Sequence, residues 1–140
     1  MCIRDRPIPK YQTEGAAGMD LYAALSKPVE LRPFDRTLIP TGLKISLPKN
    51  LEAQIRPRSG LAYTHGISIL NSPGTIDSDY RGEIKILLIN LGQDKYVIEH
   101  GSRIAQLIIT PIIQAKLEVV LALNKTKRGH RGFGSTGQKA

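Results

Sequence analysis

Short segments in which apolar and polar residues alternate make up much of the chain. The alternation is clean over residues 43–47 (LKISL) and 51–55 (LEAQI). Residues 83–90 (EIKILLIN) begin in the same way and then become apolar throughout. Alternation with a period of two predicts half-buried β-strands, and a short continuous apolar stretch is consistent with a strand buried on both faces. Residues 103–113 and 116–123 are rich in Ile and Val, and we expect strands there as well.

Turn-forming residues separate these segments at short intervals. Nine prolines and 13 glycines are enough to end each expected strand after a few residues. Many short strands with turns between them favour an all-β sandwich or barrel. The one expected helical turn spans residues 59–64, with Ser59 as a candidate N-cap. Pro111 lies within a strand-like stretch, so we expect an edge, a bulge or a strand break there.

Composition narrows the class of protein. A chain of 140 residues indicates one domain. A single cysteine, Cys2, excludes an internal disulfide framework. The one Cys and the three His are scattered along the chain, without the close spacing that the roughly four ligands of a Cys/His zinc site need. No apolar stretch approaches the roughly 18–20 residues that cross a bilayer, so we expect a soluble cytoplasmic protein that does not bind membranes. The net charge of +8 suggests an anionic partner.

The densest group of candidate chemical residues lies in residues 71–84 (NSPGTIDSDYRGEI). If the Pro-Gly turn bends the strand, Asp77 and Tyr80 can both reach one pocket, although Tyr80 and Asp79 point to opposite faces of a regular strand. A carboxylate in a pocket can act as general base on a water molecule, and an exposed tyrosine can stack on a sugar or base. A solvated acidic hairpin explains the same composition.

Three weaker signals also concern anions. Residues 56–62 (RPRSGLA) place two arginines before the expected helical turn, where guanidinium groups can bind phosphate oxygens; a solvated basic surface is the alternative. Asp20 lies in an apolar stretch (AGMDLYA) and must be paired or exposed. Gln106 lies on an expected strand (RIAQLI), where a lone glutamine is usually a surface residue.

Residues 124–140 differ from the rest in composition, because they are rich in cations and glycine and lack hydrophobic alternation. We therefore expect a barrel domain over residues 1–123 and a flexible arm over 124–140. The stretch GFGSTG matches G-x-G-x-x-G, but no expected strand precedes it and only three residues follow it, so it is not a dinucleotide-binding motif. A basic tail that binds nucleic acid through its charge remains an alternative.

Taken in order, these five stretches resemble the five motifs of the trimeric dUTP pyrophosphatases (dUTPases), over nearly the whole chain. PRSG, GTIDSDYRGEI and GFGSTG carry most of the resemblance. It implies a jelly-roll-like distorted β-barrel that forms a homotrimer, with active sites shared among subunits and closed by the C-terminal arm. It also implies Mg²⁺-dependent hydrolysis of dUTP to dUMP and pyrophosphate, which keeps uracil out of DNA and supplies dUMP for dTMP synthesis.

The resemblance also assigns roles to individual residues. Asp77 is implied as the general base, and Asp20 as a support on the metal and phosphate side, with Mg²⁺ held by phosphates and waters rather than directly by the protein. The residues implied to bind uracil and deoxyribose are Asn71, Gly74, Thr75, Ile76, Tyr80 and Phe133. Those implied to bind phosphate are Arg58, Ser59, Gly60, Gln106, Arg128, Gly134, Ser135 and Thr136.

Two features depart from the family pattern. Arg131 stands where the family usually has glycine, and residues 1–6 do not alternate where the family usually has a strand. Two other functions were compared with the dUTPase prediction. A dCTP deaminase of the same fold places a catalytic glutamate at about the position of Arg81. Arginine cannot replace that glutamate as a base, because its side chain stays protonated. A basic nucleic-acid-binding barrel fits the charge, but the aromatic content of 5% is low for base stacking, so no stable nucleic-acid binding is expected.

Overall fold

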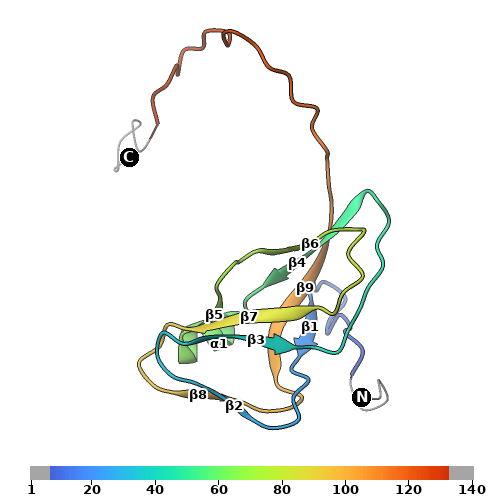
Figure 1. The fold of residues 1–140 in the computed structure, drawn as a ribbon, viewed down its shortest axis with the longest axis vertical. Helices are drawn as coiled ribbons and strands as arrows, with labels where there is room; N and C mark the ends of the chain where they lie inside the picture. The colour runs from blue at the N-terminus through green and yellow to red at the C-terminus, as the bar shows by residue number, and fades with distance from the viewer. Residues whose placement is uncertain (1–6, 133–140) are drawn as a thin grey trace.

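The computed structural model describes residues 7–132 of the chain, and strands dominate them (Figure 1). The termini of the chain, residues 1–6 and 133–140, lie outside the described residues. Among the residues described, no helix has the length and apolar character needed to cross a membrane. The elements are β1 (Met19–Tyr22), β2 (Val29–Leu31), β3 (Arg36–Pro40), β4 (Leu51–Arg56), α1 (Ser59–His65), β5 (Ile67–Ile69), β6 (Gly74–Ile76), β7 (Lys85–Asn90), β8 (Tyr96–Ile98) and β9 (Arg103–Pro111).

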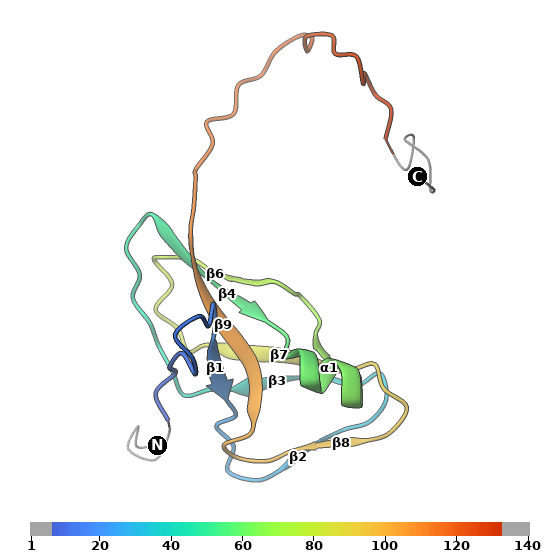
Figure 2. The ribbon, with the colours of Figure 1, turned by 180° about the vertical axis from the view of Figure 1, so that it is seen from behind.

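The strands form three antiparallel sheets. The largest has the order β1-β9-β4-β6, the second has the order β3-β7-β5, and the third pairs β2 with β8. Several neighbouring strands, such as β4 and β9, are far apart in sequence, so the sheets bring distant parts of the chain together in one barrel (Figures 1 and 2). The predicted all-β, jelly-roll-like barrel with one short helix is confirmed.

The core lies between the inward faces of the sheets, and the alternation in the sequence explains why. In β7 the buried residues are Ile86, Leu88 and Asn90, and the intervening residues are partly or fully exposed. Side chains alternate between the two faces of a strand, so one face of β7 supplies the core. The buried cluster joins residues of the eight other strands and of the loops: Leu21, Ala23, Leu31, Ile39, Ala53, Ile55, Ile67, Ile69, Ile76, Ile84, Ile98, Ile104, Ala105 and Leu107.

Most of the expected strands are present. The strands expected over residues 51–55, 83–90 and 103–113 are confirmed as β4, β7 and β9. The break expected at Pro111 is also confirmed, because β9 ends there. The prediction of a strand over residues 43–47 is wrong, because these residues form no strand. Leu43, Ile45 and Leu47 still pack against the core, so the alternation there reflects burial of side chains without a strand ladder.

The strand expected over residues 116–123 is also absent from this chain. Beyond β9 the chain leaves the barrel as an extended segment (Figure 1). The large apolar side chains of residues 116–123 are all exposed, with relative exposures from 56% for Val120 to 109% for Leu121. A strand needs a neighbour for its backbone hydrogen bonds, and within residues 7–132 this segment has none in a sheet.

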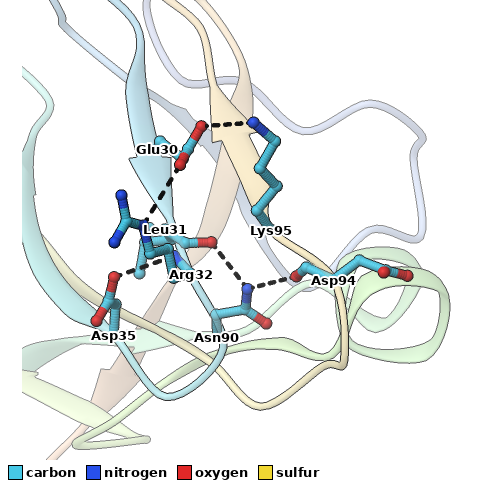
Figure 3. A network of polar contacts seen from close by, with 7 residues as sticks. All are labelled: Glu30, Leu31, Arg32, Asp35, Asn90, Asp94 and Lys95. Atoms are coloured by element: carbon cyan, nitrogen blue, oxygen red, sulfur yellow. Dashed lines mark hydrogen bonds and ion pairs between the residues drawn. The ribbon is translucent and has the colours of Figure 1, made fainter.

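A fully buried asparagine joins two of the sheets at one end of the barrel (Figure 3). Asn90, the last residue of β7, donates from Nδ2 to the carbonyl oxygens of Leu31 (2.9 Å) and Asp94 (2.8 Å). Its Oδ1 accepts from the backbone N–H of Gly92 at 2.8 Å. The side chain thereby ties the end of β7 to β2 and to the turn before β8, and its three hydrogen bonds offset the cost of burying a polar group.

Charged residues lie around the same corner but interact differently. Glu30 accepts from Lys95 Nζ at 2.9 Å and lies 3.7 Å from Arg32 Nε (Figure 3). The hydrogen bond and the charge of Lys95 hold the pKa of Glu30 below its usual value, with a smaller contribution from Arg32. These side chains are exposed, and exposed ion pairs contribute little to stability. The buried asparagine is therefore the stronger constraint at this corner.

We predict that Asn90→Ala destabilises the fold by about 3 kcal/mol, because an unsatisfied buried polar group costs roughly 1–3 kcal/mol and this change leaves several. Urea unfolding at a fixed protein concentration measures the difference in the free energy of unfolding. Asn50→Ala is the matched control, since Asn50 is exposed in the turn before β4. Equal stability of the two variants would contradict the role given to Asn90.

Candidate active site

A cavity of about 640 Å³ opens beside the hairpin that contains β6. We call it the hairpin pocket. One wall is formed by β6 and the turn after it, and the other by residues of β3, β5 and β7 such as Leu38, Ile69 and Leu87. Six residues predicted from the sequence lie around it: Asn71, Gly74, Thr75, Ile76, Asp77 and Tyr80. The structure therefore brings the expected uracil, deoxyribose and catalytic residues of this hairpin together.

Pairing with β4 positions this hairpin. Gly74 and Ile76 lie opposite Ile55 and Ala53 in the register, and both are buried. A Cβ atom at Gly74 would lie 3.3 Å from the Cβ of Ile55, which is closer than nearly all such contacts. Glycine therefore lets the hairpin backbone lie against β4. Thr75 and Asp77 are exposed, on the side of the hairpin away from the core.

The turn after β6 brings Asp77 and Tyr80 to the same pocket. The Tyr80 N–H donates to the Asp77 carbonyl oxygen at 3.1 Å, which closes the turn. Arg81 donates from Nη1 to the carbonyl oxygens of Ser78 (2.7 Å) and Tyr80 (2.9 Å), so its side chain folds over the turn backbone. The Tyr80 hydroxyl donates to the Glu83 carbonyl oxygen at 3.0 Å. The chain therefore bends after β6, and Asp77 and Tyr80 both reach the pocket, as the sequence predicts for a bent strand.

A second group of polar residues gathers around Asp20 on β1. Asp20 is only 3% exposed. Its Oδ1 accepts from Arg58 Nε at 3.1 Å and its Oδ2 from Arg103 Nη1 at 3.3 Å. Arg58 also donates from Nη1 to the Arg103 carbonyl oxygen at 3.3 Å. The charge that the sequence places in an apolar stretch is thus paired with two guanidinium groups, as burial of a carboxylate requires.

Strand register adds Gln106 to this group. Gln106 on β9 lies opposite Asp20 on β1 and opposite Arg56 on β4. Residues directly opposite each other in an antiparallel pair project on the same face of the sheet. We call Asp20, Arg58, Arg103 and Gln106 the arginine cluster. The sequence analysis missed Arg103, because only the register shows that the first residue of β9 reaches Asp20.

The helix α1 begins at this cluster. Its N-cap residue is Arg58, whose side chain makes no capping hydrogen bond, so the prediction of Ser59 as N-cap is wrong. The extended φ and ψ of Arg58, −90° and 125°, place the end of the extended segment at that residue instead. Ser59 and Gly60 form the exposed first turn. A Cβ at Gly60 would meet no atom within 4 Å, so packing within the chain does not require glycine there.

Asp77 of the hairpin pocket and Arg58 of the arginine cluster lie toward opposite ends of β4. Ile76, just before Asp77, is opposite Ala53 near the start of β4, whereas Arg56 at its end is opposite Gln106. A strand rises about 3.3 Å per residue, so roughly 15–20 Å of backbone separates the level of Asp77 from Arg58. One chain does not bring Asp77 together with Arg58 and Gln106.

Further charges border the hairpin pocket. Lys44 and Lys85 also line the hairpin pocket. No signal in the sequence identifies them, since lysines in alternating segments are common on solvated faces. They favour an anionic ligand beside Asp77. Within residues 7–132, no three His, Cys, Asp or Glu side chains gather closely enough to hold a metal ion by themselves.

Part of the expected arm is described. Arg128 is exposed and donates from Nε to the Arg131 carbonyl oxygen at 2.9 Å. The Arg131 side chain folds back onto the carbonyl oxygens of Lys127 (2.6 Å) and Arg128 (3.1 Å). The remaining predicted arm residues, Phe133, Gly134, Ser135 and Thr136, lie outside the described residues.

Comparison with known proteins identifies the family whose motifs the sequence resembles. The sequence profile of the dUTPase family matches residues 4–137. The deoxyuridine 5'-triphosphate nucleotidohydrolase of Rhizobium etli is 55% identical over 132 residues, which cover 93% of this chain and 85% of that protein. The enzyme of the same name from Caldanaerobacter subterraneus is 55% identical over 134 residues, which cover 96% of this chain and 90% of its own.

Solved structures extend the likeness to three dimensions. The dUTPase of Staphylococcus bacteriophage 80alpha, solved with dUpNHpp, aligns with a TM-score of 0.86 at 26% identity and covers 96% of this chain and 94% of its own. A variant of the dUTPase of phage phi11 of S. aureus, which coordinates a structural Mg(II) ion, aligns with a TM-score of 0.76 at 23% identity. That alignment covers 87% of this chain and 94% of the phage protein and concerns the fold alone.

Proposed function

The chain belongs to the dUTPase family, and we propose that it hydrolyses dUTP to dUMP and pyrophosphate. The observation that carries the proposal is the hairpin pocket, in which a carboxylate, an aromatic ring and a tightly packed backbone hairpin surround one cavity. The named relatives support the choice of substrate.

The hairpin supplies recognition of the nucleoside. The backbone of residues 74–76, with the Asn71 side chain, binds the edge of uracil, because a strand edge offers both N–H donors and C=O acceptors. The hairpin is packed directly on β4, so its backbone has little room to retreat from a bulkier base. A methyl group at the 5-position of thymine therefore overpacks the pocket. Tyr80, at the pocket rim, contacts the deoxyribose where a 2′-hydroxyl would clash.

Asp77 serves as the general base. Its exposed carboxylate on the pocket wall takes a proton from a water molecule as that water attacks the α-phosphorus. A bond forms between the water oxygen and the α-phosphorus, and the bond from that phosphorus to the oxygen bridging to the β-phosphate breaks. Pyrophosphate leaves with the electron pair of the broken bond, and dUMP retains the new oxygen. Phosphoryl chemistry of this kind depends chiefly on positioning and charge stabilisation.

The arginine cluster binds the phosphate chain. Arg58, Ser59, Gly60 and Gln106 contact phosphate oxygens, and Asp20 holds Arg58 in place through the 3.1 Å ion pair. A guanidinium fixed in this way requires little reorganisation when negative charge develops in the transition state. The open space at Gly60 lets a phosphate approach the backbone closely.

Mg²⁺ fits this donor set as an ion carried by the substrate. Both carboxylate oxygens of Asp20 already accept hydrogen bonds from arginines. Mg²⁺ commonly keeps several waters and binds through substrate phosphates with few protein carboxylates. Asp20 would then face the ion through water, and the ion would neutralise charge on the phosphate chain.

The complete site requires more than one chain, and we propose a homotrimer. Asp77 and Arg58 lie toward opposite ends of β4, so Asp77 of one subunit meets Arg58 and Gln106 of another. The exposed apolar segment after Pro111 supports this assembly, because a second subunit would cover it. We propose that residues 1–123, the barrel with the extended segment after β9, form the domain body and that residues 124–140 form the arm. In this proposal Arg128, Phe133, Gly134, Ser135 and Thr136 of the arm contact a site built by the other subunits.

We predict that Asp77→Asn lowers the rate of dUTP hydrolysis by about 10²–10⁴-fold, the range typical of a lost general base, without weakening binding of a non-hydrolysable dUTP analogue. Release of pyrophosphate from dUTP, dTTP, dCTP and UTP with Mg²⁺ measures turnover and specificity. Asp79→Asn is the control, because Asp79 is exposed two residues away. Ammonia released from dCTP would identify a deaminase, and tight binding of single-stranded DNA without any turnover would contradict the proposal.

A mixing experiment tests the shared site. Asp77→Asn and Arg58→Gln homotrimers should each be nearly inactive, whereas co-refolding them in equal amounts should restore about a quarter of wild-type activity if subunits assemble at random. Mixing Asp77→Asn with the Asp77→Asn, Arg58→Gln double variant is the control and should restore none. Equally low activity in both mixtures would show that Asp77 and Arg58 act within one chain.

Removing residues 128–140 should lower turnover sharply while the trimer stays intact, because the arm closes the site but the barrel and the apolar segment remain. Pyrophosphate release and analytical ultracentrifugation measure the two properties on the same sample. Full activity of the shortened protein would overturn the assignment of a closing arm.

A further inference from the structure

Glu83 lies three residues after Tyr80 and lines the hairpin pocket, but the proposed reaction gives it no role. Its Oε1 accepts from the backbone N–H of Gly42 at 2.7 Å, and this bond is partly buried. Gly42 has a φ of +69°, a left-handed conformation that favours glycine. The loop after β3 is therefore shaped to present an N–H group to the Glu83 carboxylate.

The neighbouring backbone makes this junction rigid. The hydroxyl of Thr41, which is only 2% exposed, donates to the Ile84 carbonyl oxygen at 2.6 Å, and the Thr41 N–H donates to the same oxygen at 3.2 Å. The Ile84 N–H donates to the Leu43 carbonyl oxygen at 2.8 Å. Together with the Glu83–Gly42 bond, these contacts fix residues 83 and 84 to the loop over 41–43, which is anchored in the core.

Tyr80 rests on this junction from the pocket side. Its hydroxyl donates to the backbone oxygen of Glu83 at 3.0 Å. A Cβ atom added at Gly82 would collide with the ring and hydroxyl of Tyr80, so the ring lies directly against that glycine. The orientation of an otherwise 45% exposed tyrosine is thus set by two contacts, the Glu83 carbonyl oxygen and the Gly82 backbone.

We propose that Glu83 is a positioning residue for sugar discrimination, which holds the Tyr80 ring at the deoxyribose through its bond to Gly42, with Gly82 as the surface beneath the ring. The inference rests on the proposed function, in which Tyr80 excludes a 2′-hydroxyl. Such exclusion requires a ring that cannot move aside, since small displacements at a binding group cost specificity.

The role needs a hydrogen-bond acceptor rather than a negative charge. A glutamine at position 83 keeps an oxygen for the Gly42 N–H, whereas alanine removes it. Loss of the acceptor releases the junction and lets the Tyr80 ring shift. Gly82→Ala displaces the ring directly and leaves the Glu83–Gly42 bond available, so it tests the same element by another route.

The experiment compares kcat and KM for dUTP and UTP in wild type, Glu83→Gln, Glu83→Ala and Gly82→Ala, with Glu99→Ala, an exposed glutamate elsewhere, as control. We expect Glu83→Ala and Gly82→Ala to lower the ratio of kcat/KM for dUTP over UTP by about tenfold, through a higher KM for dUTP and a gain with UTP. Glu83→Gln and Glu99→Ala should keep the wild-type ratio. An unchanged ratio in Glu83→Ala, or an equal loss in Glu83→Gln, would overturn the proposal.

A second readout does not depend on activity. In protein labelled with 3-fluorotyrosine, the ¹⁹F resonance that disappears in Tyr80→Phe identifies Tyr80. Glu83→Gln should leave this resonance in place, and Glu83→Ala and Gly82→Ala should shift it. An unshifted resonance in both contradicts the positioning role. Absence of dUTP turnover in the wild type alone contradicts the proposed function, so the two failures are distinguishable.

Discussion

Strand β4 is the constraint on which both candidate sites depend. It hydrogen-bonds with β6 on one side and with β9 on the other, and these two neighbours come from distant parts of the chain. Pairing with β6 positions the hairpin that carries Asp77. Pairing with β9 brings Gln106 level with Arg56, just before Arg58 begins the helix. A shift of the register by one residue would turn these side chains to the other face of the sheet, so one ladder sets the geometry of both groups.

The fold treats its charged groups according to their burial. Asp20 is buried and has two guanidinium partners, because an isolated carboxylate in that position would be very costly. Glu30 also has two cationic partners but remains exposed, and its lowered pKa marks an interaction that solvent largely screens. Asn90 achieves burial without charge. In the arginine cluster, the two ion pairs to Asp20 hold Arg58 and Arg103 in place, as the proposed binding of a phosphate chain requires.

The sequence predicts the strands that bury one face and the approach of Asp77 to Tyr80 across a turn, because alternation and turn residues are local properties. The other predicted residues of the hairpin pocket come from the resemblance to the dUTPase motifs. It does not predict contacts set by register. Arg103 reaches Asp20 only because β1 and β9 pair as they do, and Glu83 reaches Gly42 across 41 residues. Residues 43–47 show the limit of the pattern itself, since their alternation places side chains in the core without forming a ladder. The predicted N-cap of α1 is wrong by one residue for a related reason. The position at which the extended backbone ends, Arg58, depends on contacts with distant parts of the chain.

The segment over residues 116–123 has the apolar composition of a strand but forms none within the barrel. Its apolar residues, such as Leu117, Val119 and Leu121, are typical of a buried strand, yet each of them is exposed in the chain alone. An apolar sequence favours burial, but it does not say which molecule provides the cover. Selection for such a sequence in a segment that leaves its own barrel is understandable if a second copy supplies the missing surface. The proposed function brings Asp77 and Arg58 into one active site, and their separation along the direction of β4 agrees with a site that subunits share.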